Sequence, residues 1–261
     1  MSDSKDSKKL SEERYSKFAQ GYVESQTHAK GYDLDQFIKI SDPQPDWQML
    51  DIATGGGHTA LTFAPHVKNI IASDLTENML LAAEKNIKEK GIENITFRQA
   101  DAENLPFDDE QFDLVTCRIA AHHFPNAQKF VQETSRVLKP GGRFLLQDHV
   151  LSEDKSVADF AENFETLRDP SHNHAFSLSA WTHMLVHAGF EIYHQEEIIK
   201  RHPFIDWVKR QGHGQEVISE LEQLLDNASE TIKAWLSPLE WGTPDASFVN
   251  HHILIGSDKK S

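Results

Sequence analysis

Cysteine is nearly absent from this sequence: Cys117 stands alone among 261 residues. A single cysteine excludes a disulfide framework and any zinc site built from four cysteines, and it is consistent with a reducing compartment. No segment approaches the roughly 18 apolar residues that a membrane-spanning helix needs. The polar N-terminus also lacks the apolar core of a signal peptide. The composition predicts a soluble cytoplasmic protein without a membrane span.

Basic residues are few: 26 Lys and Arg stand against 41 Asp and Glu, which gives a net charge of −15 at pH 7. The sequence contains no long basic run. Because a phosphate backbone would be repelled by such a charge, nucleic acid is not an expected partner. The length fits one α/β domain that can bury its own core. A homodimer stays open as an alternative.

Glycine is also sparse, yet three of the 13 glycines stand together at residues 55–57. A short apolar run that contains Asp51 precedes them, and a helical pattern follows them from Thr59. A strand, a tight glycine turn and a helix open the nucleotide-binding βαβ unit. The unpaired N–H groups of such a helix N-terminus suit ligands with a carboxylate, ribose or phosphate. An ordinary loop is the alternative interpretation of three glycines alone.

Short apolar runs alternate with helical patterns beyond residue 46. The runs predict strands at residues 49–53, 70–74, 95–99, 112–118, 143–148, 190–194 and 248–256. The helical patterns lie at residues 77–90, 127–138, 156–168, 179–188 and 204–236. This alternation predicts a doubly wound α/β fold with a mostly parallel, seven-stranded, Rossmann-like sheet. Helices are expected on both faces of the sheet, together with a helical cover.

An acid follows or ends each of several predicted strands, at Asp51, Asp74, Asp101 and Asp148. Ligands of such sheets lie beyond the carboxyl ends of the strands, where the strand order reverses. One acid in that position is usually only solvated. Four at the same edge predict a site for a polar ligand.

The chain resembles the class I S-adenosylmethionine-dependent methyltransferases over about residues 15–200. Residues 51–57 match the family's D-x-G-x-G-x-G motif, with Ala53 in place of the first glycine. An alanine fits this compact turn if its φ is negative. The runs at residues 112–115 and 120–124 look like the fourth motif, and residues 138–143 look like the family's LKPGG turn. The resemblance is closest to the ubiquinone/menaquinone-biosynthesis C-methyltransferase branch, whose members act on small molecules.

The resemblance implies S-adenosyl-L-methionine as cofactor and S-adenosyl-L-homocysteine as product. It places the ribose hydroxyls on Asp74 and the adenine beside Asp101 and Ala102. A loop around His28 and Gly31 is expected to close over the methionine end. The full set of predicted cofactor-binding residues is Asp51, Ala53, Gly55, Gly57, Asp74, Leu75, Asp101, Ala102, Arg118 and His28.

The family likeness divides the chain into a disordered tail (1–10), an N-terminal helical cap (11–45), a cofactor-binding core (46–150) and a remainder (151–261). The remainder completes the sheet and carries helical insertions over the substrate. The two insertions, residues 151–178 and 203–243, together with Trp181 just beyond the first, are rich in aromatic residues: Phe160, Phe164, Phe176, Trp181, Phe204, Trp207, Trp235 and Trp241. An aromatic-lined lid would suit a planar or apolar acceptor. The alternative is that these side chains pack the extra helices on the sheet.

Two histidines, His122 and His123, follow the fourth strand and are the candidate catalytic residues. One could act as a base if the acceptor must lose a proton in a C- or O-methylation. The alternative is that one forms the cavity wall and the other caps the next helix. Asp148 and His149 are a second candidate pair. The histidine pairs lack metal-site spacing, so no metal is expected, and Cys117 is expected to be buried and inert.

Two other functions stay open at this point. A catalytically silent S-adenosylmethionine-binding regulatory protein would keep the cofactor pocket without turnover. A nicotinamide-dependent oxidoreductase shares the strand–turn–helix opening, and Asp74 would then bind the ribose. The acid at the end of the first strand would crowd a pyrophosphate, so the methyltransferase is the preferred hypothesis.

Overall fold

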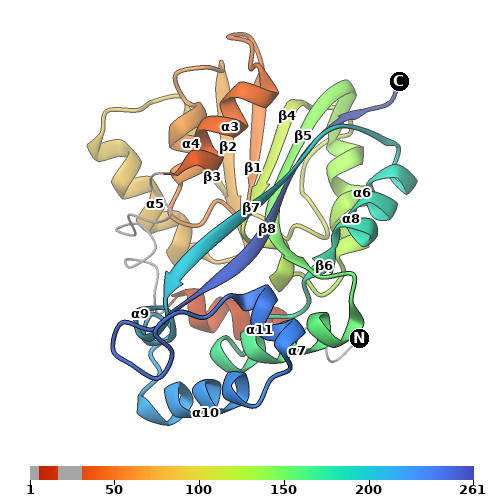
Figure 1. Cartoon of the computed structure of the whole chain (residues 1–261). Coiled ribbons are helices and arrows are strands. Elements are labelled where there is room, and N and C mark those ends of the chain that lie inside the picture. Colours follow the sequence, from red (N-terminus) through yellow and green to blue (C-terminus); the bar gives the residue numbers. More distant parts are fainter. Residues whose placement is uncertain (1–5, 17–30) are drawn as a thin grey trace.

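The computed structural model describes residues 6–16 and 31–261, and within them eight strands form one sheet (Figure 1). Seven strands follow the order β3-β2-β1-β4-β5-β8-β7, and the two-residue β6 pairs with β5 outside this path. Their bounds are β1 Gln48–Ile52, β2 Asn69–Asp74, β3 Ile95–Gln99, β4 Phe112–Arg118, β5 Leu138–Leu151, β6 Phe176–Ser177, β7 Phe190–Pro203 and β8 Ser247–Lys259. The predicted doubly wound, mostly parallel α/β fold is confirmed.

The strands β1 to β5 pair in parallel, and β8 runs antiparallel between β5 and β7. Both β7 and β8 extend beyond their predicted ends because they pair over their whole length, from Phe190 opposite Lys259 to Pro203 opposite Ser247. The reversal brings the start of β8 and the end of β7 to the same edge as the carboxyl ends of β1, β2 and β4. That edge therefore receives side chains from the parallel strands and from the C-terminal strands β7 and β8.

Helices cover both faces of the sheet, because strand residues alternate between the two faces. On one face, Met49, Leu114 and Leu145 pack with Phe37 and Phe63. On the other, the neighbouring strand positions pack against α6 and α8. The helices on the two faces are α3 Tyr32–Ser41, α4 His58–Phe63, α5 Glu77–Glu89, α6 Ala127–Val137 and α8 Leu178–His187. A one-turn helix, η1 Ala121–His123, precedes α6.

A separate helical layer lies beyond the carboxyl ends of the parallel strands, at the bottom of Figure 1. It consists of α7 Lys155–Arg168, α9 Phe204–Lys209, α10 Gln215–Asp226 and α11 Glu230–Leu236. These helices form their own apolar cluster, which includes Phe164, Phe204, Trp207, Leu221 and Phe248. We refer to this layer as the cover.

Residues 6–16 form a helix that lies on the cover side of the sheet (Figure 1). The predicted disordered tail over residues 1–10 is therefore wrong for residues 6–10. The helix is held by polar contacts to distant residues, which a short polar segment does not reveal in the sequence. Within the part of the chain that the structure describes, every helix is too short or too polar to span a bilayer.

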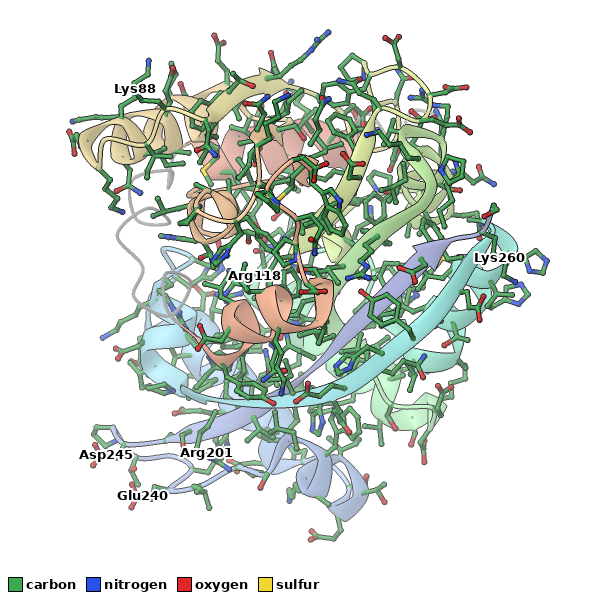
Figure 2. All side chains as sticks on the ribbon, turned by 90° about the horizontal axis from the view of Figure 1, so that it is seen from above. Lys88, Arg118, Arg201, Glu240, Asp245 and Lys260 are labelled. Atoms are coloured by element: carbon green, nitrogen blue, oxygen red, sulfur yellow. The ribbon has the colours of Figure 1, made fainter. Side chains whose placement is uncertain are left out.

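Charged side chains are spread over the outer surface in Figure 2, where Lys88, Glu240 and Lys260 project from the edges of the molecule. Arg118, in contrast, lies near the centre of that view, and its side chain is only 6% exposed. Cys117, its neighbour in β4, is fully buried, and burial raises the pKa of its thiol well above the usual range. The expected buried cysteine is confirmed, and a thiol with so high a pKa is unreactive.

Candidate functional site

A cavity of about 450 Å³ opens where the strands β1, β2 and β4 end and the cover begins. Eight of the predicted cofactor-binding residues line it: Asp51, Ala53, Gly55, Asp74, Leu75, Asp101, Ala102 and Arg118. Gly57 lies outside the lining, and His28 lies outside the described residues. Both candidate catalytic histidines, His122 and His123, also line the cavity. The fold thus collects these residues from the ends of four strands, β1 to β4, and from the segments that follow them, around one space.

The carboxylate of Asp51 is held by two hydroxyl groups and is only 1% exposed. Thr54 Oγ1 donates to Oδ2 and Thr116 Oγ1 donates to Oδ1, each at 2.6 Å. Burial raises the pKa of Asp51 to about 6, although these hydrogen bonds act in the opposite direction. Because the two threonines lie in the glycine turn and in β4, Asp51 ties the turn to the sheet.

The glycine turn differs from the expectation for Ala53. Its φ is +52°, in the left-handed region, and not negative as the sequence analysis required. A non-glycine residue in that region costs roughly 1–2 kcal/mol. The turn therefore holds Ala53 in a conformation that a glycine adopts at no steric cost.

Gly57 has a packing role in this turn. It precedes α4 with φ +79°, and a Cβ at this position would lie 2.7 Å from Ile87 Cδ1 of α5. A side chain here would displace the end of Ile87 and would be strained by the positive φ, so Gly57 serves the packing of the turn and not the wall of the cavity.

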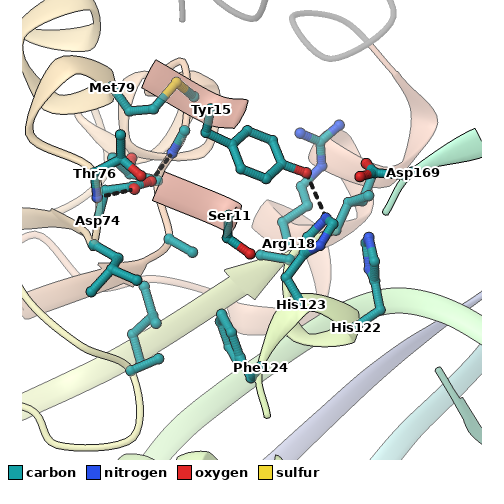
Figure 3. A pocket seen from close by; sticks show the side chains of 18 of the residues that line it. Ser11, Tyr15, Asp74, Thr76, Met79, Arg118, His122, His123, Phe124 and Asp169 are labelled. Atoms are coloured by element: carbon teal, nitrogen blue, oxygen red, sulfur yellow. Dashed lines mark hydrogen bonds between the residues drawn. The ribbon is translucent and has the colours of Figure 1, made fainter. Parts of the chain in front are cut away.

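Asp74 joins the end of β2 to the glycine turn (Figure 3). Its Oδ2 accepts from the backbone N–H of Gly55 at 3.0 Å, and its Oδ1 accepts from that of Thr76 at 2.9 Å. Burial raises the pKa of Asp74, and these backbone hydrogen bonds oppose the rise. The side chain of Thr76 and the backbone of Leu75 also stabilise the ionised carboxylate, which lines the cavity.

Asp101 is covered by the helix over residues 6–16. Lys8 Nζ lies 2.7 Å from both Asp101 Oδ2 and Glu103 Oε2. The backbone N–H of Glu103 donates to Asp101 Oδ1 at 3.0 Å. Lys8 and Ser11 therefore belong to the cavity wall. The sequence analysis missed Lys8 because it treated residues 1–10 as disordered, and it did not select Ser11 from the helical cap.

His122 forms a close pair with Asp148 at the other end of the cavity. Nδ1 of His122 lies 2.6 Å from Asp148 Oδ1, and the backbone N–H of His122 donates to Asp148 Oδ2 at 2.7 Å. Burial lowers the pKa of His122 well below its usual value, and the imidazoles of His123 and His172 lower it further. A neutral His122 donates its Nδ1 proton to Asp148, so its Nε2 is left as a proton acceptor.

His123 has both ring nitrogens engaged. Nδ1 lies 2.8 Å from the carbonyl oxygen of Ser171, which can only accept. Nε2 therefore accepts from the hydroxyl of Tyr15 at 2.5 Å, as Figure 3 shows. Neither histidine caps α6, because Asn126 does so by accepting from the N–H of Lys129. The alternative capping role for this pair is wrong.

Five imidazoles gather at this end of the cavity. Ring centroids lie 4.1 Å apart for His122 and His123, 4.6 Å for His122 and His149, 5.4 Å for His122 and His172, and 4.6 Å for His149 and His252. Burial lowers the pKa values of His149 and His252 well below their usual range. Among the described residues, no group of three or more His, Cys, Asp or Glu side chains could hold a metal ion. We refer to His122, His123, His149, His172 and His252 as the histidine cluster.

The antiparallel strands β7 and β8 add side chains that the sequence analysis did not select. Lys200 and His202 of β7, and Asn250 and His252 of β8, line the cavity at alternate positions. The sequence carries no clear signal for them, because adjacent residues such as Ile198 and Ile199 do not alternate in polarity. In the structure, residues 190–203 alternate between exposed and more buried positions. That pattern indicates a long strand with one inward face.

The predicted aromatic lid is corrected by the structure. Of the eight aromatic residues in the two insertions, only Trp207 lines the cavity. The others pack inside the molecule: Phe176 and Trp181 belong to the core beside α8, and the rest belong to the apolar cluster of the cover. Their packing, rather than contact with a ligand, accounts for most of the aromatic content of these segments.

Sequence comparison finds a methyltransferase domain over residues 50–146. The chain is 40% identical to the uncharacterized methyltransferase YcgJ of Bacillus subtilis (strain 168) over 252 residues, which cover 94% of this chain and 98% of that protein. It is 33% identical to the ubiquinone/menaquinone biosynthesis C-methyltransferase UbiE of Zymomonas mobilis over 114 residues, which cover 44% of this chain and 47% of that one.

Solved structures agree with these matches. The crystal structure of a protein from Bacillus halodurans C-125 superposes with a TM-score of 0.85 at 38% identity, covering 88% of this chain and 100% of that one. The YcgJ protein of Bacillus subtilis gives a TM-score of 0.82 at 36% identity, with 88% and 99% coverage. The matches extend beyond residues 50–146 into the cover, so the whole architecture is shared.

Proposed function

Because the chain belongs to the class I S-adenosylmethionine-dependent methyltransferases, we propose that it methylates a small-molecule acceptor on carbon or oxygen. The observation that supports this proposal is the shared cavity of Asp51, Asp74, Asp101 and His122. The carboxylates of Asp51, Asp74 and Asp101 line the same cavity as the imidazole of His122, which can accept a proton. Cofactor and acceptor would thus meet in one space.

The donor and acceptor groups of the cavity fit S-adenosylmethionine. When bound, this cofactor supplies a methyl group that is already activated by its sulfonium. Asp74 presents a carboxylate to the cavity, and a carboxylate can accept hydrogen bonds from two vicinal ribose hydroxyls. Asp101 and the backbone of Ala102 would hold the adenine. Asp51, buried behind the turn, would position Gly55 and the methionine arm.

The enclosure of the cavity favours a small acceptor. The helix over residues 6–16 lies across one side through Lys8 and Tyr15, and α9 borders the other through Trp207. A volume of about 450 Å³ is within the range of sites for small ligands, roughly 300–1,000 Å³. The net charge of −15 also disfavours a polyanionic acceptor such as nucleic acid.

We assign the role of base to His122 rather than to His123. Both nitrogens of His123 are already engaged, with Ser171 and with Tyr15. His122 is oriented by Asp148, and its Nε2 makes no hydrogen bond among the described residues. His123 would instead fix the ring of Tyr15 over the cavity. Methyl transfer then depends mainly on alignment and exclusion of water, with His122 taking a proton where the acceptor has one to lose.

Calorimetric titration of the protein with S-adenosylmethionine and S-adenosylhomocysteine, followed by a methylation assay on a panel of small phenols and quinols, tests this proposal. We expect both nucleosides to bind, and S-adenosylhomocysteine to be formed with at least one acceptor. Each product is then identified as C- or O-methylated by mass spectrometry and NMR.

Two outcomes would contradict the proposal. Tight binding of NAD without binding of either sulfur nucleoside would favour the oxidoreductase. Binding of S-adenosylmethionine without transfer to any member of the panel would favour the regulatory protein.

A further inference from the structure

Cationic side chains gather at the end of the cavity that lies near Arg118, one of the predicted cofactor residues. Arg168 of α7, Lys200 of β7 and Arg210, which follows α9, all line this end. They come from three elements of a protein with a net charge of −15. Positive charge gathered in one cavity of an acidic protein favours an anionic ligand there.

Lys200 shares its carboxylate partner with another cation. Lys200 Nζ lies 3.1 Å and Arg118 Nη2 2.8 Å from the same oxygen, Asp33 Oδ2. The pKa of Asp33 is lowered against the effect of its burial, because Arg118 and Lys200 stabilise the ionised form. One buried carboxylate between two cations leaves the group with an excess positive charge.

The other nearby carboxylates already have partners. Asp169 accepts from the N–H of Ser171 at 2.9 Å and from Gln211 Nε2 at 2.7 Å. Glu165 accepts from Asn250 Nδ2 at 2.8 Å, and its distance to Arg168 Nη1 is 4.0 Å. Arg168 donates from Nε to the carbonyl of Trp207 at 3.2 Å. Among the described residues, the ion pair of Arg168 with a carboxylate is therefore a long one, to Glu165 at 4.0 Å.

Two imidazoles on the neighbouring strands β7 and β8 have buried nitrogens without a partner among the described residues. They are Nε2 of His202 and Nδ1 of His252. Burial lowers the pKa of His202 to about 4, and the positive charges of Arg210, Arg168 and Lys200 contribute. Both rings are thus neutral at pH 7, and a neutral imidazole can donate one N–H to an anion. A buried polar group without a protein partner is able to bind a ligand or an ordered water.

We propose that the methyl acceptor carries an anionic group, a carboxylate or a phosphate, which Lys200, Arg168 and His252 bind at this end of the cavity. This inference rests on the proposed function and specifies its substrate class. The guanidinium of Arg168 lies 4.5 Å from the centre of the Trp207 ring, so an apolar surface adjoins the charged one. An aromatic or other apolar body that bears an acidic group matches both surfaces. The acidic group would sit on the cationic wall and leave the methylated atom toward His122.

A calorimetric experiment with three probes of the same aromatic body tests this proposal. The protein is first saturated with S-adenosylhomocysteine and then titrated with benzoate, phenyl phosphate and neutral benzamide. We expect at least one anion to bind about tenfold more tightly than benzamide, since a charge-assisted hydrogen bond in a buried site has that effect. The stronger of the two anions identifies carboxylate or phosphate as the recognised group.

Variants at Lys200 identify the binding wall. Lys200→Gln should remove most of the preference for the anion, while Lys200→Arg should retain it. Lys155→Gln is the matched control, because Lys155 is exposed and lies at the distant end of the helix that ends in Arg168. The midpoint of thermal unfolding, measured for each variant, shows that the fold is intact.

The failures of the two proposals are distinguishable. Absence of S-adenosylhomocysteine binding would overturn the proposed function. If that nucleoside binds normally, two results would overturn only the present inference. Benzamide would bind as tightly as both anions, or none of the three probes would bind. An unchanged anion preference in Lys200→Gln would also overturn it.

Discussion

His122 and Asp148 are joined twice, through the imidazole Nδ1 at 2.6 Å and through the backbone N–H of His122 at 2.7 Å. The double contact fixes both the ring and the one-turn helix η1 that carries it. It links the end of β4 to β5, so the candidate base is placed by the sheet itself. A base held in this way is oriented before the acceptor binds.

We expect His122→Asn to lower kcat by roughly 100-fold, because general base catalysis contributes about that factor. The affinity for S-adenosylhomocysteine should stay within about twofold, since the role of His122 is with the acceptor. Initial rates of S-adenosylhomocysteine formation and calorimetric titration measure the two quantities. His183→Asn is the control, because His183 is exposed on α8. A rate that falls equally in both variants would remove His122 from the mechanism.

Asp74→Ala should weaken S-adenosylhomocysteine binding by about 1–3 kcal/mol, through loss of charge-assisted bonds to the ribose. The variant also loses the acceptor for the N–H groups of Gly55 and Thr76. Asp74→Asn keeps one oxygen acceptor and should therefore lose less affinity. Calorimetry provides the comparison, with Asp46→Ala at an exposed position as the control. An unchanged affinity in Asp74→Ala would place the sugar elsewhere.

Tyr15→Phe should loosen the helix over residues 6–16 without unfolding the protein. The variant loses only the hydroxyl that donates to His123 Nε2, and a hydrogen bond of this kind contributes about 0.5–1.5 kcal/mol. Amide hydrogen exchange in residues 6–16 should accelerate roughly 2- to 10-fold, whereas exchange in α11 should not change. Tyr193→Phe removes an exposed hydroxyl bonded to the carbonyl of Ile40 and is the matched control. Equal exchange in the two variants would show that Tyr15 does not anchor the helix.

The central sheet could be predicted from the sequence because its signals are local. The strands β1, β2 and β4 are short apolar runs bounded by turn residues, and the glycine turn after β1 marks the start of α4. The acids at the ends of these strands followed from the same reasoning, because parallel strands end at one edge. Asp51, Asp74 and Asp101 accordingly line one cavity.

The acceptor end of the cavity could not be predicted in the same way. Lys200 and His252 reach it only because β7 and β8 pair over their whole length, and that pairing depends on contacts distant in sequence. Residues 6–16 are polar, and their helix is held by contacts such as Lys8 with Asp101 across 93 residues. Trp207 could not be told apart from the aromatic residues that only pack, because both kinds share the same apolar pattern.

Asp51→Asn should change the pH dependence of stability. Burial raises the pKa of Asp51 from 3.8 to about 6, so folding disfavours the ionised carboxyl. The contribution of Asp51 to stability is fully present below the pKa that its carboxyl has in the unfolded chain, and it is lost as the pH rises through about 6. The difference between the folded and unfolded pKa values corresponds to roughly 3 kcal/mol of unfolding free energy, at about 1.36 kcal/mol per pKa unit. Asparagine does not titrate, so the variant lacks this loss.

The measurement is the difference in free energy of unfolding between the wild-type protein and Asp51→Asn, obtained from urea titrations between about pH 4.5 and pH 8. Taking the difference matters because buried histidines with lowered pKa values act in the opposite sense. The pKa of His252 is lowered by burial, so its contribution to stability is present above the usual pKa and is lost as the pH falls. Those histidines titrate alike in both proteins and cancel. We expect the variant to gain stability relative to the wild type as the pH rises, and a difference that is constant with pH would show that Asp51 ionises normally.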